Sequence, residues 1–291
     1  MKIVKKLMIT AFALYFGLAV PLGAMASGNT SSVEKAGNSV VKVNYYYADP
    51  DYGDMILMSN TGFAVNENTV VTTCAAVNLN QDLIDMTSEL LGITKEQLVE
   101  NTQIRVSAKA GGSCMAEIRF DDQKTDLAVL ELEGKLDGCS GIPVRSSSEL
   151  TASEECSVLW FSPIVTYSQD GPNEDCFTAH GKVKEVVTKG GIELVRYKVD
   201  SAVFEQPSSG PLVDAGGNVI GFTTGAASSN GNDDCYAVSS DTLIRHLKNC
   251  NVHFSSPETS KQEDEKPSQR KSDPPTLIKP SPFKKNTTGW E

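Results

Sequence analysis

Short runs of β-branched and aromatic residues recur along the middle of the chain, and clusters of Gly, Asn, Asp, Ser or Pro separate most of them. The clearest runs are SVVKVNYYY (39–47), TGFAV (61–65), TVVTT (69–73), IRVSAKA (104–110), DLAVLEL (126–132), ECSVLWF (155–161), VRYKV (195–199) and VIGFTT (219–224). Regular short strands punctuated by turns are typical of sandwiches and barrels rather than of βαβ units. The pattern therefore predicts an all-β fold between about residues 39 and 237.

Two segments depart from the strand pattern. Residues 82–101 carry apolar positions at helical spacing among many acidic residues, which predicts one or two short helices. They form the centre of an insertion at about 79–103. Residues 240–248 begin with Ser and Asp and then place Leu and Ile on one face, which predicts a C-terminal helix that closes the fold.

The N-terminal end has the features of a targeting segment. Three lysines precede the apolar run 7–20, and the small residues Ala24 and Ala26 follow where a signal peptidase reads. The run is shorter than the roughly 20 residues that a membrane span needs. Residues 1–26 are therefore predicted to be a signal peptide and 27–38 a linker, with a retained anchor as the alternative. We expect a secreted, extracellular or cell-envelope protein of bacterial type, without a membrane span after signal removal.

The C-terminal end, residues 255–291, holds six of the 13 prolines and mixes both charge signs without apolar periodicity. Such a chain buries too little surface to offset its ordering entropy, which predicts a disordered tail. Contact of the tail with a cell-wall polymer is the functional alternative to a solvated tail.

Without its two ends, the core at 27–254 has 16 basic and 31 acidic residues, a net charge of −15. This charge argues against nucleic acid and favours basic partners.

Three segments, in order, carry the pattern of one family. They are GFAVNENTVVTTCAAV (62–77), TDLAVLEL (125–132) and QPSSGPLV (206–213), the last followed by GGNVIGFTTG (216–225). They resemble the trypsin-like serine peptidases, closest to the Deg/HtrA branch. The resemblance implies two six-stranded antiparallel β-barrels, the first over residues 39–148 and the second, with the C-terminal helix, over 149–254. Catalysis in this family takes place in the cleft between the barrels.

The resemblance also assigns the catalytic positions. The family's serine falls on Ser208 and its aspartate on Asp126, but its histidine falls on Ala75. The oxyanion hole, implied at Gln206 and Ser208, is altered as well, since the family has Gly where this chain has Gln206. Pro207 follows and carries no N–H. The family also keeps a Gly at the position after Ser208, where this chain has another serine.

A serine hydroxyl is a poor nucleophile until a neighbouring base takes its proton, and a methyl group cannot act as that base. The resemblance therefore predicts a pseudoenzyme that keeps the serine endopeptidase fold and binds peptide or protein. One alternative is an active or residual endopeptidase that uses Ser208 and Asp126 with a base elsewhere. A second is a structural module of the cell envelope. No metal and no cofactor are implied.

The family pattern further indicates where a peptide would lie. Thr223, Thr224 and Gly225 match the strand that pairs with the substrate backbone in active relatives, and Tyr236 matches the wall of the specificity pocket. An exposed strand edge there would bind an extended peptide without cutting it. Asp126 is explained either as a vestige of catalysis or as an acceptor of backbone or hydroxyl hydrogen bonds, with Thr223 as a candidate donor.

The remaining features are the acidic insertion, the histidines and the cysteines. The insertion at 79–103 follows the vacant histidine position, and it either roofs the cleft, presents a surface to a basic partner or fills space beside the first barrel. His180, His246 and His253 map outside the cleft and are assigned surface or packing roles. Export permits disulfides, so the seven cysteines predict up to three bridges and one free thiol. Cys74 is expected to be a small buried hydrophobe or a disulfide partner.

Overall fold

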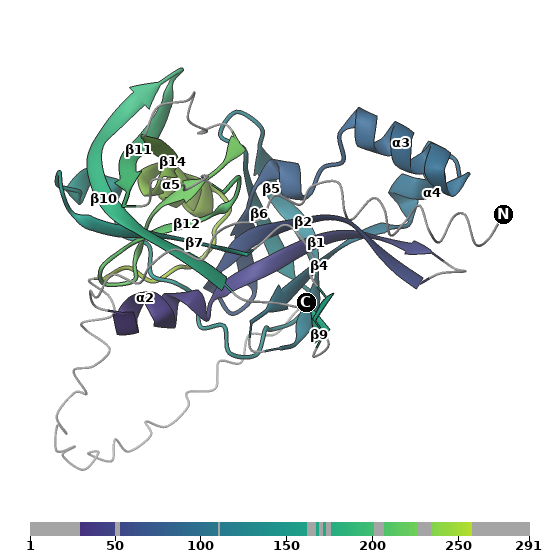
Figure 1. Ribbon diagram of the computed structural model, residues 1–291, viewed down its shortest axis with the longest axis horizontal. Helices are drawn as coiled ribbons and strands as arrows, with labels where there is room; N and C mark the ends of the chain where they lie inside the picture. Colours follow the sequence, from purple (N-terminus) through teal and green to yellow (C-terminus); the bar gives the residue numbers. More distant parts are fainter. Residues whose placement is uncertain are drawn as a thin grey trace, which may run out of the picture.

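Two closed six-stranded antiparallel barrels lie side by side in a computed structural model of the protein (Figure 1). The structure describes residues 30–49, 53–109, 111–161, 167–168, 171–172, 176–200, 207–225 and 234–257. The predicted all-β architecture of two barrels is confirmed. The predicted signal peptide, and all but the first three residues of the predicted tail, lie outside the described residues. Within those ranges no helix is both long enough and apolar enough to cross a membrane.

The first barrel has the strand order β1-β2-β3-β6-β5-β4. Its strands are β1 (Val40–Asp49), β2 (Gly53–Asn66), β3 (Thr69–Thr72), β4 (Thr102–Ala108), β5 (Ser113–Asp122) and β6 (Leu127–Leu132). β1 closes the barrel because it pairs with both β2 and β4, so that Val41 lies opposite Gly62 and Ala108. A Cβ at Gly62 would lie 2.7 Å from the Val71 carbonyl oxygen, which explains the glycine.

The helical insertion lies between β3 and β4, as predicted. It contains α3 (Gln81–Leu91) and α4 (Lys95–Glu100), and the 3-10 helix η1 (Cys74–Ala76) precedes it. Asn80 caps α3 by accepting the N–H of Leu83, and Thr94 forms a capping box with Gln97 at α4. Figure 1 shows α3 and α4 on the side of the first barrel that faces away from the second barrel. The insertion therefore does not roof the space between the barrels.

The second barrel has the strand order β10-β11-β14-β13-β12-β7. Its strands are β7 (Glu155–Phe161), β10 (Cys176–Lys189), β11 (Ile192–Val199), β12 (Gly210–Asp214), β13 (Val219–Thr223) and β14 (Cys235–Ser239). β8 (Tyr167–Ser168) and β9 (Gly171–Pro172) form a separate two-stranded sheet. The predicted C-terminal helix is α5 (Ser240–Asn249), which the side chain of Ser239 caps.

Helix α2 (Thr30–Gly37) occupies the segment for which the sequence pattern predicts a linker. Val33 and Ala36 are buried in the main core, so tertiary packing holds this short helix in place. Gly217, in the turn between β12 and β13, lies beneath it with φ of 77°. A Cβ there would come within 2.5 Å of the Ser32 carbonyl oxygen, so the close approach needs the glycine.

One apolar cluster joins the two barrels. Phe63 of β2 and Phe222 of β13 are fully buried, with ring centroids 5.6 Å apart. Leu243 and Leu247 of α5 belong to the same cluster. Because close-packed side chains fix the relative position of the barrels, residues from both can meet in one site.

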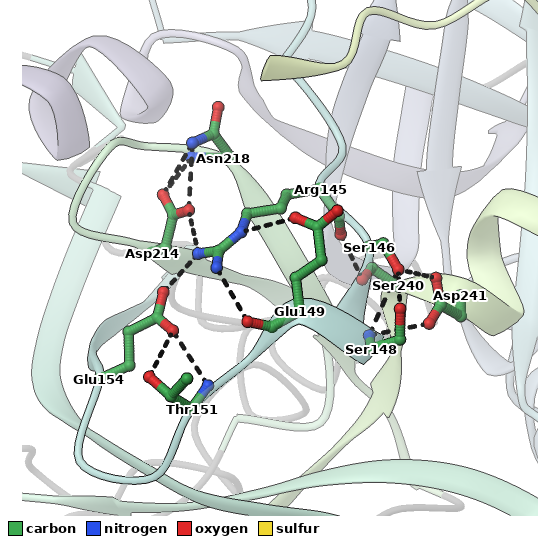
Figure 2. A network of polar contacts seen from close by, with 10 residues as sticks. All are labelled: Arg145, Ser146, Ser148, Glu149, Thr151, Glu154, Asp214, Asn218, Ser240 and Asp241. Carbon is green, nitrogen blue, oxygen red and sulfur yellow. Dashed lines mark hydrogen bonds and ion pairs between the residues drawn. The ribbon is translucent and has the colours of Figure 1, made fainter. Parts of the chain in front are cut away.

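A polar network around Arg145 fixes the segment that connects the barrels (Figure 2). The guanidinium bonds Glu154 and lies 3.1 Å from the carboxylate of Asp214 at the end of β12. Figure 2 also shows Ser146 and Ser148 beside Asp241 of α5, which accepts the Ser148 N–H at 3.0 Å. The network thereby connects the 3-10 helix η2 (Ser147–Glu149), β12 and α5.

All seven cysteines lie within the described residues, and the structure holds them as thiols. The disulfides expected from export and from the cysteine count are therefore not formed. A disulfide needs Cα atoms within about 7 Å and suitably directed Cβ atoms, which neither the number nor the spacing of cysteines determines.

Candidate active site

Ala75 and Asp126, the predicted histidine and aspartate positions, lie next to each other in the first barrel. Ala75 belongs to η1, and Asp126 directly precedes β6. The N–H of Ala75 donates to Oδ1 of Asp126 at 3.0 Å, and the N–H of Cys74 donates to its main-chain oxygen at 3.3 Å. Asp126 has φ of 54°, in the left-handed region that Asp tolerates better than most residues. The main chain of η1 therefore holds the carboxylate of Asp126, while the alanine at position 75 supplies no imidazole to it.

The second barrel contributes Gly225 to the same carboxylate. Its N–H donates to Oδ2 of Asp126 at 3.0 Å, so each carboxylate oxygen accepts an amide from a different barrel. Burial raises the pKa of the Asp126 carboxyl above its usual range, although the amides of Ala75, Gly225 and Cys74 act to lower it. The interpretation of Asp126 as an acceptor of backbone hydrogen bonds is confirmed.

The threonines before Gly225 do not have the exposure that the sequence predicts. Thr223 and Thr224 are completely buried, and only Gly225 of this segment is exposed. Thr223 donates its hydroxyl to the carbonyl oxygen of Gly210 at 3.0 Å, not to Asp126. Thr223 is the last residue of β13, which lies between β12 and β14 in the closed barrel, and Thr224 follows it directly. The expectation of an exposed strand edge is thereby corrected for these two residues.

The predicted nucleophile loop leads into β12. Ser208 is exposed, whereas Ser209 is buried and its Oγ accepts the N–H of Thr61 in β2 at 2.9 Å. The hydroxyl of Thr61 in turn accepts the N–H of Phe161 in β7 at 2.9 Å. Ser209 thus anchors the loop to the first barrel. No local sequence motif predicts this role. Gln206 lies outside the described residues.

The comparisons with known proteins agree with this arrangement. Residues 60–222 match the family of the trypsin-like peptidase domain. The chain belongs to this family. Serine protease HTR4 from Bos taurus is 28% identical to it over 207 residues, or 67% of the chain. Since the aligned region is 36% of that relative, the chain spans about a third of its length. The predicted resemblance to the HtrA branch of the trypsin-like peptidases is confirmed.

Among the described residues of this member of the trypsin-like peptidase family, no histidine takes the place of the missing base. Nδ1 of His180, on β10, lies 2.8 Å from the hydroxyl of Ser157. His246 is buried in α5, with Nε2 3.3 Å from Oδ2 of Asp122. His253 is exposed. The predicted packing and surface roles therefore hold, and His180 lies on the second strand of its barrel.

Cys74 is also unsuited to act as a nucleophile. It is buried, and its Sγ donates to the carbonyl oxygen of Leu127 at 3.1 Å. Burial raises the pKa of the thiol to about 12, so the reactive thiolate is scarce near neutral pH. The prediction of a small buried hydrophobe is confirmed.

Among the described residues, no group of three or more His, Cys, Asp or Glu is arranged to hold a metal ion.

Tyr236, the predicted wall of the specificity pocket, is partly buried on β14. Nζ of Lys189 lies 3.6 Å from the centroid of its ring, a cation–π contact that covers the ring from the β10 side. Arg196 of β11 is its partner across the sheet. The role of Tyr236 toward a peptide stays a prediction.

Proposed function

We propose that this trypsin-like peptidase homologue is an exported pseudoenzyme that binds peptide or protein segments. The observation that carries the proposal is that the residue whose N–H bonds Asp126 is Ala75, which has no imidazole to act as the base. Peptide hydrolysis needs a base that takes the proton of the serine and returns it to the leaving amine. Loss of a triad member lowers kcat by roughly 10⁴–10⁶.

The nucleophile loop supports the same proposal. Pro207, directly before Ser208, has no N–H to offer a developing oxyanion. Removal of one oxyanion-hole donor lowers kcat by about 10²–10³. The chain thus departs from the catalytic pattern at two independent places, at Ala75 and in this loop. A single substitution would therefore not restore catalysis.

Binding, in contrast, needs only accessible backbone and complementary charge. Ser208, Ala75 and Gly225 are exposed and carry small side chains or none, so they leave room for an extended peptide. The net charge of −15 over residues 27–254 steers basic peptides toward the protein. Export rests on the signal-like segment at residues 1–26, and places the protein outside the cell or in the cell envelope.

The proposal is tested by labelling the purified chain with a fluorophosphonate, which reacts with activated serines. An active trypsin-like peptidase is the positive control and Ser208→Ala the negative control. We expect the chain to label no more than Ser208→Ala does. Stoichiometric labelling at Ser208 would overturn the pseudoenzyme and favour the alternative of an active or residual endopeptidase.

The binding part is tested separately with peptide arrays that contain basic, neutral and acidic sequences. We expect retention of basic peptides that falls as the salt concentration rises, because exposed charges are screened. Failure to retain any peptide would favour the envelope structural module. In that case deletion of residues 255–291 should release the protein from a cell-wall pellet.

A further inference from the structure

The carboxylate of Asp126 has no ion-pair partner among the residues that the structure describes. Its oxygens accept one hydrogen bond each, from the amides of Ala75 and Gly225, and a carboxylate has about four lone-pair positions in all. Within the described ranges no Lys, Arg or His side chain contacts it. A half-buried carboxylate without a cationic partner is unfavourable, and burial accordingly raises its pKa. The group is therefore prepared to accept a further donor that carries positive charge.

The two residues that flank the carboxylate are exposed and small. Ala75 and Gly225 flank Asp126 and are exposed, and neither has a side chain longer than a methyl group. A Cβ built on Gly225 would lie 3.4 Å from Oδ2 of Asp126, and no other heavy atom of the described residues, its chain neighbours apart, lies within 4 Å of it. The two residues that donate to the carboxylate thus leave its remaining lone pairs accessible from solvent.

We propose that Asp126, Ala75 and Gly225 form a binding site for an imidazolium group, supplied by a histidine side chain of the bound peptide. An imidazolium is planar and donates an N–H to the carboxylate in a charge-assisted hydrogen bond. Ala75, whose N–H bonds Asp126, is exposed and has only a methyl side chain. This inference rests on the proposed peptide-binding function and adds a preferred side chain to it. The acidic core of the molecule attracts such a cation at long range.

The amides of Ala75 and Gly225 are built-in reporters of the site, since both donate directly to the carboxylate. Imidazole is titrated at pH 6, where it is mostly protonated, into ¹⁵N-labelled protein at constant ionic strength. We expect saturating shifts of both amide resonances with a dissociation constant of about 1–10 mM. Shifts that grow linearly without saturation would overturn the site.

Two variants and two further probes sharpen the test. Asp126→Asn should weaken imidazole binding about tenfold or more, because it removes the charge, while Asp121→Asn, at an exposed position of β5, should leave it unchanged. Ala75→His keeps the carboxylate but fills the space beside it, so it should also abolish binding. This second variant keeps the test valid if Asp126→Asn does not fold.

Guanidinium and methylammonium should shift the two amide resonances at least several-fold less than imidazole does. Equal binding by either probe, or retention of binding in Ala75→His, would overturn the imidazolium assignment.

The outcomes for this site and for the pseudoenzyme are independent. Peptide retention on the arrays without any imidazole response would overturn the Asp126 site and leave the proposed function standing. Fluorophosphonate labelling at Ser208 together with saturating imidazole shifts would overturn the pseudoenzyme and support the site.

Discussion

Ser209 links the nucleophile loop to the first barrel through a single hydrogen bond. Replacement of Ser209 by Ala or by Gly, the family's usual residue, leaves the buried N–H of Thr61 without an acceptor. We expect the free energy of unfolding to fall by about 1–3 kcal/mol in both variants. Urea denaturation measures this loss. Ser208→Ala is the control, because Ser208 is exposed, and should change stability by less than about 0.5 kcal/mol.

A hydroxyl without structural importance would give a different result. In that case Ser209→Ala would match Ser208→Ala. Ser209→Gly tests in addition whether the glycine of active relatives is tolerated by this backbone, and a gain in stability would contradict the anchoring role.

Restoring the histidine separates the vacant base from the altered loop. In Ala75→His the imidazole would lie beside the carboxylate of Asp126, and the negative charge should raise its pKa above the ordinary value of about 6.5. We nevertheless expect little fluorophosphonate labelling, since Pro207 still offers no N–H and Gln206 still replaces glycine. An NMR pH titration of the imidazole and the labelling yield check both parts.

The double variant Ala75→His with Asp126→Asn is the matched control for this experiment. It should lose the raised imidazole pKa, because the carboxylate charge is gone. Labelling of Ala75→His to the level of an active peptidase would show that the nucleophile loop is intact.

At the scale of the elements, a strand or helix was predictable from sequence where the pattern of its own residues defines it. The run at 126–132 became β6, and 240–248 became α5, because apolar periodicity and capping residues define them. Helix α2 was not predictable, because its two buried residues find their partners only in the assembled core. The burial of Thr223 in β13 depends in the same way on closure of the second barrel.

The Arg145 network predicts a large effect for one side chain. Arg145→Met would leave Glu154 and Asp214, whose side chains are 20% and 7% exposed, without their common cation. Removal of one partner from a buried ion pair is strongly destabilising, so we expect a loss of about 3 kcal/mol in the free energy of unfolding. Lys135→Met removes an exposed ion pair to Glu67 and should change stability by less than about 1 kcal/mol. Equal effects of the two variants in urea denaturation would contradict the role of the network.

At the scale of the whole molecule, sequence motifs identified the two barrels and the vacant histidine position, because both follow from the order of segments along the chain. They could not show that the amide of Gly225 reaches Asp126 from the other barrel, nor that Ser209 bonds Thr61. Such contacts join residues about 100 or more positions apart, and they exist only once the barrels pack together. The candidate site was thus predictable by position, while its hydrogen bonding was not.

A further contact between the barrels predicts a dependence of stability on pH. His246 of α5 lies 3.3 Å from Asp122 of β5, next to Phe120 and Arg245. Burial lowers the pKa of His246 from its ordinary value of 6.5, Arg245 lowers it further, and Asp122 opposes both. The folded protein therefore prefers the neutral imidazole. As the pH falls below about 6.5 the unfolded chain takes up the proton first, so the free energy of unfolding decreases until the lower folded pKa is reached.

His246→Gln removes this titration and should flatten the stability profile between pH 7 and pH 5, measured by urea denaturation at each pH. His253→Gln is the control, since His253 is exposed, and should keep the slope of the unmodified protein. The lowered pKa of Asp122 contributes a loss of stability only below about 3.8, outside this window. The raised pKa of Asp126 acts with the opposite sign but is present in both variants, so it cancels in the comparison. A slope unchanged in His246→Gln would therefore mean that the buried imidazole does not couple proton binding to the packing of α5 against the first barrel.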